Sequence, residues 1–476
     1  MKITTDLAHQ TEVFNRFKDN AKAALFMEQG TGKTRIIIKL TENHFLLKRI
    51  DAVVVITTST LVMNWSMVEI PLHHTLPYHQ YVWKRTKRLL KSPLLFYFIA
   101  NVDATTTEKF RSVWKDFVRF YPNYMLVVDE STLVKNPKAE RTRAVMEMAG
   151  RAKVRCIASG TPIPKGPLDL YSQTEILGPG TLGFKSYYAF KNRYAITKLE
   201  RNGVRAYEVV TGYQNINELS EKVGKIAAVI KKKDCLDLPD KIYETVHVDF
   251  TPEQMKAYND LVQRAITYLE NHEITAVNAV SLINRLLQIC CGQLKVEDRY
   301  LSIPNHRLET LKDLVEQSGT QVIVWSSYVQ NSLDAAAYLG PLAVRVPAGL
   351  SPTALYSKLQ AFRTGDKKAL IANPASLGHG LTLNEAPNII YLSNRFNLEH
   401  RLQSEDRSHR YGQDKNVLYT DLITLGTVEE RVIQILQEKK NLADLILTKA
   451  KLISFITGKL SGVEPQTSAS LAAKTG

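Results

Sequence analysis

The chain has little cysteine and no long apolar run. Its 476 residues include 4 cysteines, Cys156, Cys235, Cys290 and Cys291, and none belongs to a Cys-x-x-Cys pair. Adjacent cysteines are poorly placed to bridge each other, so we expect no disulfide framework and a reducing compartment. The longest notable apolar run, residues 93–100, is too short to span a bilayer, and the first residues lack the apolar core of a signal peptide. These absences indicate a cytoplasmic protein without a membrane anchor.

Acidic residues are also in deficit. The formal net charge is +15 and the isoelectric point is about 9.4. A basic balance favours a polyanionic partner, because Lys and Arg that neutralise phosphates release condensed counterions. A basic protein without such a partner is an equally good interpretation of composition alone. The length and the 44% hydrophobic content suit a folded chain of two or three domains.

Short β-rich runs alternate with helical stretches in two separate sets. This alternation predicts two α/β domains with parallel sheets, whose strands are expected at 53–56, 125–128 and 154–158, and then at 322–325, 369–372, 388–392 and 417–420. Between the sets the pattern becomes helical, which predicts an insertion that reaches across both domains. The expected division is 1–177, first domain; 178–305, helical insertion and linker; 306–450, second domain; and 451–476, a partly disordered tail.

A glycine-rich loop stands near the start of the chain. Gly30-Thr31-Gly32-Lys33-Thr34 follows an apolar segment and precedes a helical one, which is the context of a phosphate-binding loop. Glycines let backbone N–H groups approach phosphate oxygens, Lys33 would reach the β- and γ-phosphates, and Thr34 would offer a hydroxyl to Mg²⁺. The full pattern has glycine where Met27 stands, so the match is partial.

Two polar segments follow the later strands of the first set. Asp129 and Glu130 would lie at the carboxyl edge of a parallel sheet, where such folds bind ligands. Asp129 would hold Mg²⁺ through water and Glu130 would activate the attacking water. A solvated turn is the alternative, which the upstream phosphate loop disfavours. After the next strand, the hydroxyls of Ser159-Gly160-Thr161-Pro162 could bond either the Asp-Glu loop or a nucleic-acid phosphate.

A basic segment lies far downstream. Arg407 and Arg410 are three residues apart, so on one helix they would share a face, with Gln403 one turn earlier. Guanidinium groups suit phosphate and could stabilise charge on a γ-phosphoryl group. A solvated basic helix is the alternative. Gly380 stands in a segment with the flexibility for a hinge or a backbone contact to phosphate.

Taken in order, these segments resemble the helicase-like ATPases of superfamily two, specifically the SWI/SNF family. The resemblance covers about residues 6–440 and includes Leu7-Ala8-His9-Gln10, 28–34, Thr60–Trp65, 129–132, 159–162, 238–241, 285–290 and 403–413. Residues 380–383 and 405–407 look most like the compact annealing-helicase branch. Two departures stand out: Thr132 replaces the usual His, and Phe396-Asn397-Leu398 replaces Trp-Asn-Pro.

The resemblance implies two RecA-like domains with a helical insertion, and ATP and Mg²⁺ as cofactors. The residues it implies are, for catalysis, Lys33, Asp129, Glu130, Arg407 and Arg410; for cofactor binding, Gln10, Gly30, Thr31, Gly32, Lys33, Thr34, Arg35, Gly380 and Gln403; for metal, Thr34 and Asp129; and for nucleic acid or coupling, Asn64, Trp65, Ser159 and Thr161.

The implied activity is ATP-dependent translocation on duplex or branched DNA by a monomeric motor, at the nucleoid or a viral replication site, or in the nucleus if the source is eukaryotic. A protein partner for targeting stays open. A strand-separating helicase on DNA or RNA is the first alternative. The second is a slow ATP-dependent clamp on DNA. Thr132 keeps this alternative open, because its replacement of His puts in doubt the link between hydrolysis and the family's third motif, which Ser159–Pro162 matches.

Overall fold

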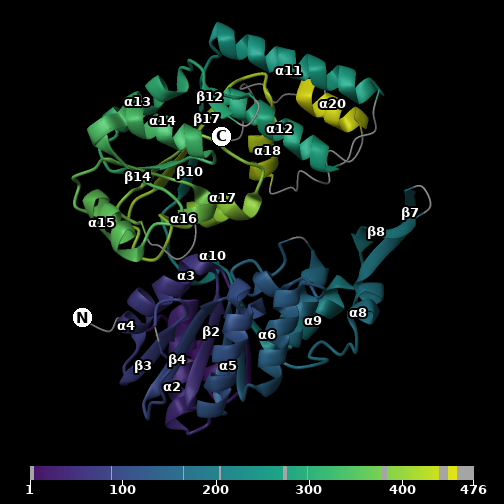
Figure 1. Cartoon of the computed structure of the whole chain (residues 1–476), viewed down its shortest axis with the longest axis vertical. Helices are drawn as coiled ribbons and strands as arrows, with labels where there is room; N and C mark the ends of the chain where they lie inside the picture. Colours follow the sequence, from purple (N-terminus) through teal and green to yellow (C-terminus); the bar gives the residue numbers. More distant parts are fainter. Residues whose placement is uncertain are drawn as a thin grey trace, which may run out of the picture. The chain divides into compact units, whose positions relative to one another are not determined.

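The computed structural model describes residues 5–86, 88–164, 166–202, 205–271, 276–296, 299–377, 383–438 and 449–457. The chain forms two compact units (Figure 1). The first contains the residues up to Leu238, and the second is formed mainly by the chain from Pro239 onward. In the described ranges, no helix combines the length and the apolar character needed to cross a membrane.

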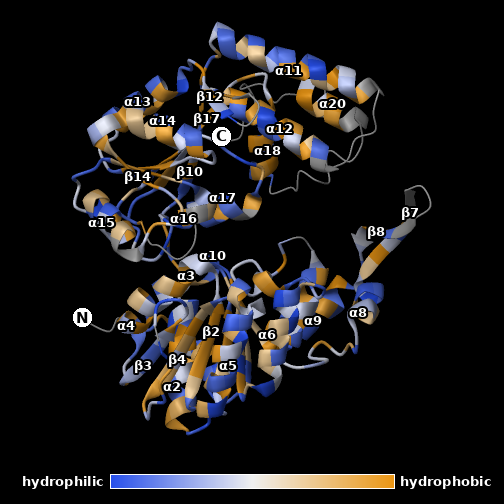
Figure 2. Cartoon of the chain, viewed as in Figure 1, coloured by the Kyte–Doolittle hydropathy of each residue, from blue (hydrophilic) through white to orange (hydrophobic). Residues whose placement is uncertain are grey.

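A parallel sheet of 7 strands forms the centre of the first unit. Its strands, in spatial order, are β3 (Tyr78–Val82), β4 (Leu95–Asn101), β2 (Ala52–Thr57), β5 (Tyr124–Asp129), β6 (Val154–Ala158), β1 (Lys22–Met27) and β9 (Ala227–Ile230). Side chains alternate between the two faces of a strand, and both faces are buried here. Figure 2 shows β2 and β4 as hydrophobic segments.

Helices cover both faces of this sheet. One hydrophobic cluster joins it to α1 (Ala8–Phe17), α2 (Lys33–Leu46), α3 (Ser59–Asn64), η1 (Trp65–Glu69) and α4 (Ile70–His73). The opposite cluster joins it to η2 (Val102–Thr106), α5 (Glu108–Phe120), η3 (Ser131–Val134), α6 (Glu140–Arg151), α7 (Leu170–Glu175), α8 (Tyr187–Tyr194) and α9 (Ile216–Ile226). Short helical turns η4 (Pro167–Asp169) and α10 (Lys232–Cys235) complete the unit, and an antiparallel hairpin, β7 (Ala195–Asn202) with β8 (Arg205–Tyr213), projects from it (Figure 1).

The second unit contains a parallel sheet of 6 strands. In spatial order they are β10 (Lys241–His247), β17 (Val417–Ile423), β16 (Asn388–Tyr391), β13 (Val322–Trp325), β15 (Ala369–Ala372) and β14 (Ala343–Val346). Helices α13 (Arg307–Gln317) and α14 (Val329–Leu339) pack on one face. A separate helical cluster contains α11 (Pro252–Asn271), α12 (Ala276–Cys290), α18 (Val428–Gln437) and α20 (Lys449–Thr457). The other elements are η5 (Gly340–Leu342), α15 (Pro352–Arg363), α16 (Pro374–Leu377), α17 (Leu398–Glu405) and the hairpin β11 (Gln293–Val296) with β12 (Arg299–Ser302).

The two expected parallel α/β sheets are confirmed, and they form two RecA-like domains. The segment 178–305, however, does not form one insertion. Its first part runs up to β9, which pairs with β1 and so extends the first sheet, whereas its second part begins at β10, which pairs with β17 of the second sheet. Residues 451–457 of the expected tail belong to α20, whose Leu452 and Phe455 are buried in the helical cluster.

Candidate active site

Three of the predicted segments meet at the carboxyl edge of the first sheet. β5, β6 and β1 are consecutive neighbours, with Asp129 opposite Ala158 and Ala158 opposite Leu25. The phosphate loop, the Asp-Glu pair and the segment Ser159–Pro162 follow these three strands directly. The carboxyl ends of parallel strands lie at the same edge of a sheet, so residues about a hundred positions apart in the sequence become neighbours there.

The phosphate loop has the backbone conformation that its glycines predict. Gly30 and Gly32 adopt φ values of 83° and 87°, in the region that residues with a Cβ avoid, and Gly32 precedes the first residue of α2. Lys33 Nζ donates to the carbonyl oxygen of Met27 at 2.8 Å and to that of Glu28 at 3.2 Å. The ammonium group therefore lies across the loop, at the helix N-terminus that attracts anions.

The start of α1 is bonded to the phosphate loop. Gln10 Nε2 donates to the carbonyl oxygen of Thr31 at 3.2 Å, and a ring nitrogen of His9 lies 2.8 Å from the same oxygen. A Cβ at Gly32 would stand 2.1 Å from Gln10 Nε2 and would displace the end of that side chain, while the φ of 87° itself favours glycine. The predicted adenine-reading residue thus lies directly against the loop. His9 carries no signal in the sequence beyond its place beside Gln10.

Arg35, which the resemblance assigns to cofactor binding, forms an ion pair in the structure. Its Nε donates to Asp6 Oδ1 at 2.5 Å, and Lys39 pairs with the other carboxylate oxygen. Burial raises the pKa of Asp6, but Lys39 and Arg35 outweigh burial and hold this pKa below its ordinary value. The structure therefore places Arg35 in an ion-pair cluster that fastens the segment before α1 to α2.

Asp129 and Glu130 lie at the end of β5 in a constrained setting. Asp129 is buried, and it accepts hydrogen bonds from Trp65 Nε1 at 2.8 Å and from the Glu130 backbone N–H at 3.1 Å. Burial raises the pKa of Asp129, while Trp65 and the charge of Lys33 act in the opposite direction. Glu130 adopts φ 59°, a left-handed conformation that costs energy for a residue with a Cβ. The buried carboxylate and the Thr34 hydroxyl are hard oxygen donors, which fit Mg²⁺ bound together with phosphate oxygens.

Trp65 belongs to the core and not to an exposed nucleic-acid contact. It begins the π-helical turn η1, and the N–H of Ile70 donates to its carbonyl oxygen. The indole is 1% exposed, and its N–H is the donor to Asp129. Asn64 donates to Glu69 Oε1 at 2.9 Å within the same turn. Two roles were predicted for Trp65: contact with nucleic acid, or coupling of the nucleic-acid site to the ATP site. A buried side chain bonded to Asp129 fits the second role and does not fit surface contact with nucleic acid.

The third motif packs against the phosphate loop. Ser159 is fully buried, its N–H donates to the carbonyl oxygen of Leu25 at 3.1 Å, and its Oγ accepts from the N–H of Thr161 at 3.2 Å. A Cβ at Gly160 would stand 2.9 Å from the Gln29 side chain and 3.7 Å from Lys33 Nζ. Glycine is therefore needed for close approach to the loop, and Ser159 serves the packing of this edge.

The expected helix carrying both arginines is shorter than predicted. α17 ends at Glu405, and Arg407 and Arg410 follow it in a turn segment, so they do not share a helix face. The turn is favoured because its polar groups bond other segments: Arg407 O accepts from the N–H of Leu383 at 2.9 Å, and Ser408 Oγ donates to Leu383 O at 3.1 Å.

Arg407 and Arg410 also differ in exposure. Arg407 is 1% exposed and its Nε donates to the carbonyl oxygen of Gln403 at 2.9 Å, whereas Arg410 is partly exposed. Gln403 itself is buried in the last turn of α17. Gly380 lies outside the described residues.

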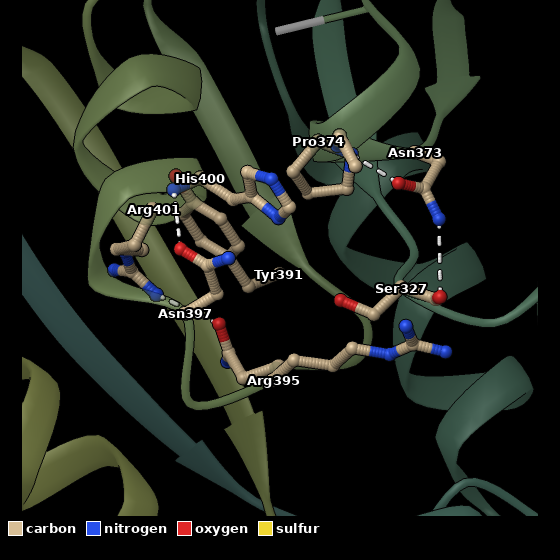
Figure 3. A pocket seen from close by; sticks show the side chains of 10 residues that line it. Ser327, Asn373, Pro374, Tyr391, Arg395, Asn397, His400 and Arg401 are labelled. Atoms are coloured by element: carbon tan, nitrogen blue, oxygen red, sulfur yellow. Dashed lines mark hydrogen bonds between the residues drawn. The ribbon is translucent and has the colours of Figure 1, made fainter. Parts of the chain in front are cut away.

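A polar pocket lies at the carboxyl edge of the second sheet. Figure 3 shows the side chains of Ser327, Asn373, Arg395 and His400 around it, and no carboxylate is among the described side chains that line it. Asn373 Nδ2 donates to the carbonyl oxygen of Ser327 at 3.0 Å. The guanidinium of Arg395 lies 4.9 Å from the ring centre of Tyr328. The lining is therefore suited to an anion.

Beneath this pocket lies a buried ion-pair cluster. Arg401 donates to both carboxylate oxygens of Asp421, at 2.6 and 2.9 Å, and to Glu405 Oε1 at 2.9 Å. The other oxygen of Glu405 accepts from Lys241 at 3.0 Å and from Tyr243 at 2.8 Å. Every charge in the cluster is paired, so α17 is fixed to β17 and β10.

Two protein-family models match this chain. An SNF2-related domain matches residues 11–294, and a helicase conserved C-terminal domain matches residues 306–412. Protein p41 of Acyrthosiphon pisum secondary endosymbiont phage 1 is 23% identical and aligns with 95% of this chain and 100% of its own length. The DNA annealing helicase and endonuclease ZRANB3 of Mus musculus is 23% identical over 74% of this chain, which spans only 31% of that relative.

Among solved structures, the Sulfolobus solfataricus SWI2/SNF2 ATPase core in complex with dsDNA aligns with 95% of this chain and 97% of its own, at 21% identity and a TM-score of 0.43. The SNF2-related match alone covers more than half of the chain. The chain belongs to the SNF2-related family, and it is an ATP-dependent enzyme of the helicase and translocase type.

Proposed function

We propose that this chain is an ATP-dependent translocase on double-stranded DNA, which remodels protein–DNA complexes or branched DNA in the cytoplasm. The observation that carries the proposal is the meeting of the phosphate loop, Asp129–Glu130 and Ser159–Pro162 at one sheet edge. This arrangement would provide phosphate binding, metal binding and a general base in one place. The net charge of +15 supports a nucleic-acid partner.

The roles of the residues at this edge follow from their chemistry. The N–H groups of the phosphate loop and Lys33 would hold the phosphates, and Gln10 would contact the adenine. Thr34 and Asp129 would hold Mg²⁺, which neutralises phosphate charge when bound. Glu130 would orient and deprotonate the attacking water.

The basic residues of the later part of the chain have two proposed roles. Arg407 and Arg410 would stabilise the negative charge that develops on the γ-phosphoryl group, with Gln403 supporting nucleotide binding. The anion pocket that contains Arg395 and His400 would bind a backbone phosphate of DNA. Arg395→Ala should then weaken binding to all sequences alike and reduce the salt slope of log Kd by about one.

Triplex displacement tests translocation directly. A duplex carrying a third strand is incubated with the protein and ATP, beside a forked duplex, and Lys33→Ala serves as the inactive control. A translocase releases the third strand and leaves the fork paired. Fork opening without triplex displacement would indicate a strand-separating helicase instead. Nucleotide-dependent DNA binding with neither activity would indicate the slow clamp.

A further inference from the structure

A buried glutamine of the first unit connects two of the motifs at the ATP site. Gln173 lies on α7 and is 0% exposed. Its Oε1 accepts from Ser131 Oγ at 2.7 Å, and its Nε2 donates to the carbonyl oxygens of Pro162 and Asp169, each at 2.7 Å. Both N–H bonds of this amide are therefore used and its oxygen is paired, without help from solvent.

The partners of Gln173 are the residues beside the catalytic pair and at the end of the third motif. Ser131 is fully buried and directly follows Glu130, whose φ of 59° makes its backbone sensitive to small displacements. Pro162 ends the segment Ser159–Pro162, which packs against the phosphate loop through Gly160. A single side chain thus bridges the Asp-Glu segment and the third motif.

This bridge lies beside the position where the chain departs from its family. Thr132 occupies the place of the His that the family resemblance leads one to expect, and it is buried next to Ser131. The replacement of His by Thr132 removes the side chain that the family resemblance assigns to the link between hydrolysis and the third motif. The hydrogen bonds of Gln173 supply a connection between these segments that does not involve residue 132.

A buried amide whose hydrogen-bonding groups all have partners can transmit a movement of one partner to another, because breaking any one of its bonds costs free energy. If Ser131 and Glu130 were to shift together during hydrolysis, either Gln173 would follow and move Pro162, or a buried polar group would lose its partner. A coupling of this kind between two sites is typically worth about 5- to 150-fold in an equilibrium.

We propose that Gln173 is a positioning residue that couples the Asp129–Glu130 segment to the third motif through Ser131 and Pro162, and so links ATP hydrolysis to DNA. The DNA-dependent part of this inference rests on the proposed function. The side chain of Gln173 is bonded to Ser131, Pro162 and Asp169, so its proposed role is to position the segments that it holds.

The test compares Gln173→Leu and Ser131→Ala with Thr174→Val. Thr174 is the next residue of α7 and is equally buried. Among the described residues its hydroxyl bonds only carbonyl oxygens of its own helix, so Thr174→Val controls for a general weakening of α7. Each variant is measured for binding of a fluorescent ATP analogue, for ATP hydrolysis with and without duplex DNA, and for its thermal midpoint.

We expect Gln173→Leu to bind the ATP analogue within about twofold of wild type and to lose about 5- to 150-fold in DNA-stimulated kcat, with a smaller loss in the absence of DNA. Ser131→Ala should show the same pattern, and the double variant should be no worse than Gln173→Leu, because both changes break one connection. Thr174→Val should keep the stimulated rate.

The inference is overturned if Gln173→Leu keeps the stimulated rate, or if binding, basal rate and stimulated rate all fall equally. If Gln173→Leu does not fold, Ser131→Ala decides: full stimulation in that variant rejects the coupling, and selective loss of stimulation supports it. If duplex DNA does not stimulate the wild-type protein, the proposed function is wrong. If it stimulates the wild-type protein and Gln173→Leu equally, the proposed function stands and only the role of Gln173 is wrong.

Discussion

Replacing Trp65 by Phe should impair ATP hydrolysis beyond the cost of a smaller ring. The indole N–H donates to Asp129 Oδ2 at 2.8 Å, and the side chain is 1% exposed. Phenylalanine keeps much of the apolar contact but has no donor. The buried carboxylate then loses the neutral partner that fixes its orientation at the edge of the sheet.

The expected size follows from the kind of bond that is lost. A hydrogen bond to a charged group contributes about 1.5–3 kcal/mol. If Asp129 needs this bond to hold its orientation for Mg²⁺ and phosphate, kcat/KM falls by about 10- to 150-fold, since 1.4 kcal/mol corresponds to about tenfold. Binding of ATP should fall less, because Lys33 and the loop N–H groups are unaffected.

Trp83→Phe is the matched control. Trp83 is also buried in the first unit, but in the part of the chain that the structure describes its Nε1 has no hydrogen-bond partner. Both variants shrink the same ring, so the difference between their kcat/KM values isolates the Trp65–Asp129 bond. The assay is ATP hydrolysis at saturating Mg²⁺, with folding checked by urea titration. Losses that agree within about twofold would refute the reasoning.

The remaining predictions concern residues of α17 and of the turn that follows it. Arg401→Met removes the cation paired with the buried carboxylate of Asp421 and should destabilise the second unit by about 3–5 kcal/mol, which ¹⁹F NMR of fluorotryptophan at Trp325 can follow through a urea titration; a loss below about 1 kcal/mol would contradict it. Burial raises the pKa of Glu405, but Lys241 and Arg401 outweigh it and hold this pKa below its ordinary value of 4.5. Stability from ionised Glu405 is therefore complete above that value and is lost as pH falls toward the lower pKa of the folded state, so the urea midpoint of this unit should drop below pH 4.5, and a flat profile would argue against the pairing. Arg410→Ala should lower kcat much more than ATP binding, and equal losses in both would assign Arg410 a structural role.

Local pattern was enough to predict that these segments meet at one edge of the first sheet. Each segment there consists of a buried strand followed immediately by polar or glycine residues, and parallel pairing brings the strand ends together without further information. The positive φ values of Gly30 and Gly32 likewise follow from residue type. The same logic predicted both parallel sheets.

The features that the sequence did not predict depend on partners far along the chain. The helix carrying Gln403 stops at Glu405 because the following residues bond Leu383 and Pro239. Gln173 meets Ser131 across 42 positions, and nothing in the sequence around α7 marks that contact.

Sheet membership is the other such feature. The segment 178–305 is shared between the two units because β9 and β10 each complete a different sheet, and pairing of this kind is decided by tertiary packing rather than by strand propensity.

The most direct test of the account measures the rate of ATP hydrolysis with duplex DNA, with single-stranded DNA of the same sequence, with RNA and without nucleic acid. Lys33→Ala and Glu130→Gln are included to show that the rate belongs to this site. The account predicts the greatest stimulation by duplex DNA and no stimulated turnover in either variant. A rate that duplex DNA does not raise, or that Glu130→Gln retains, would contradict it.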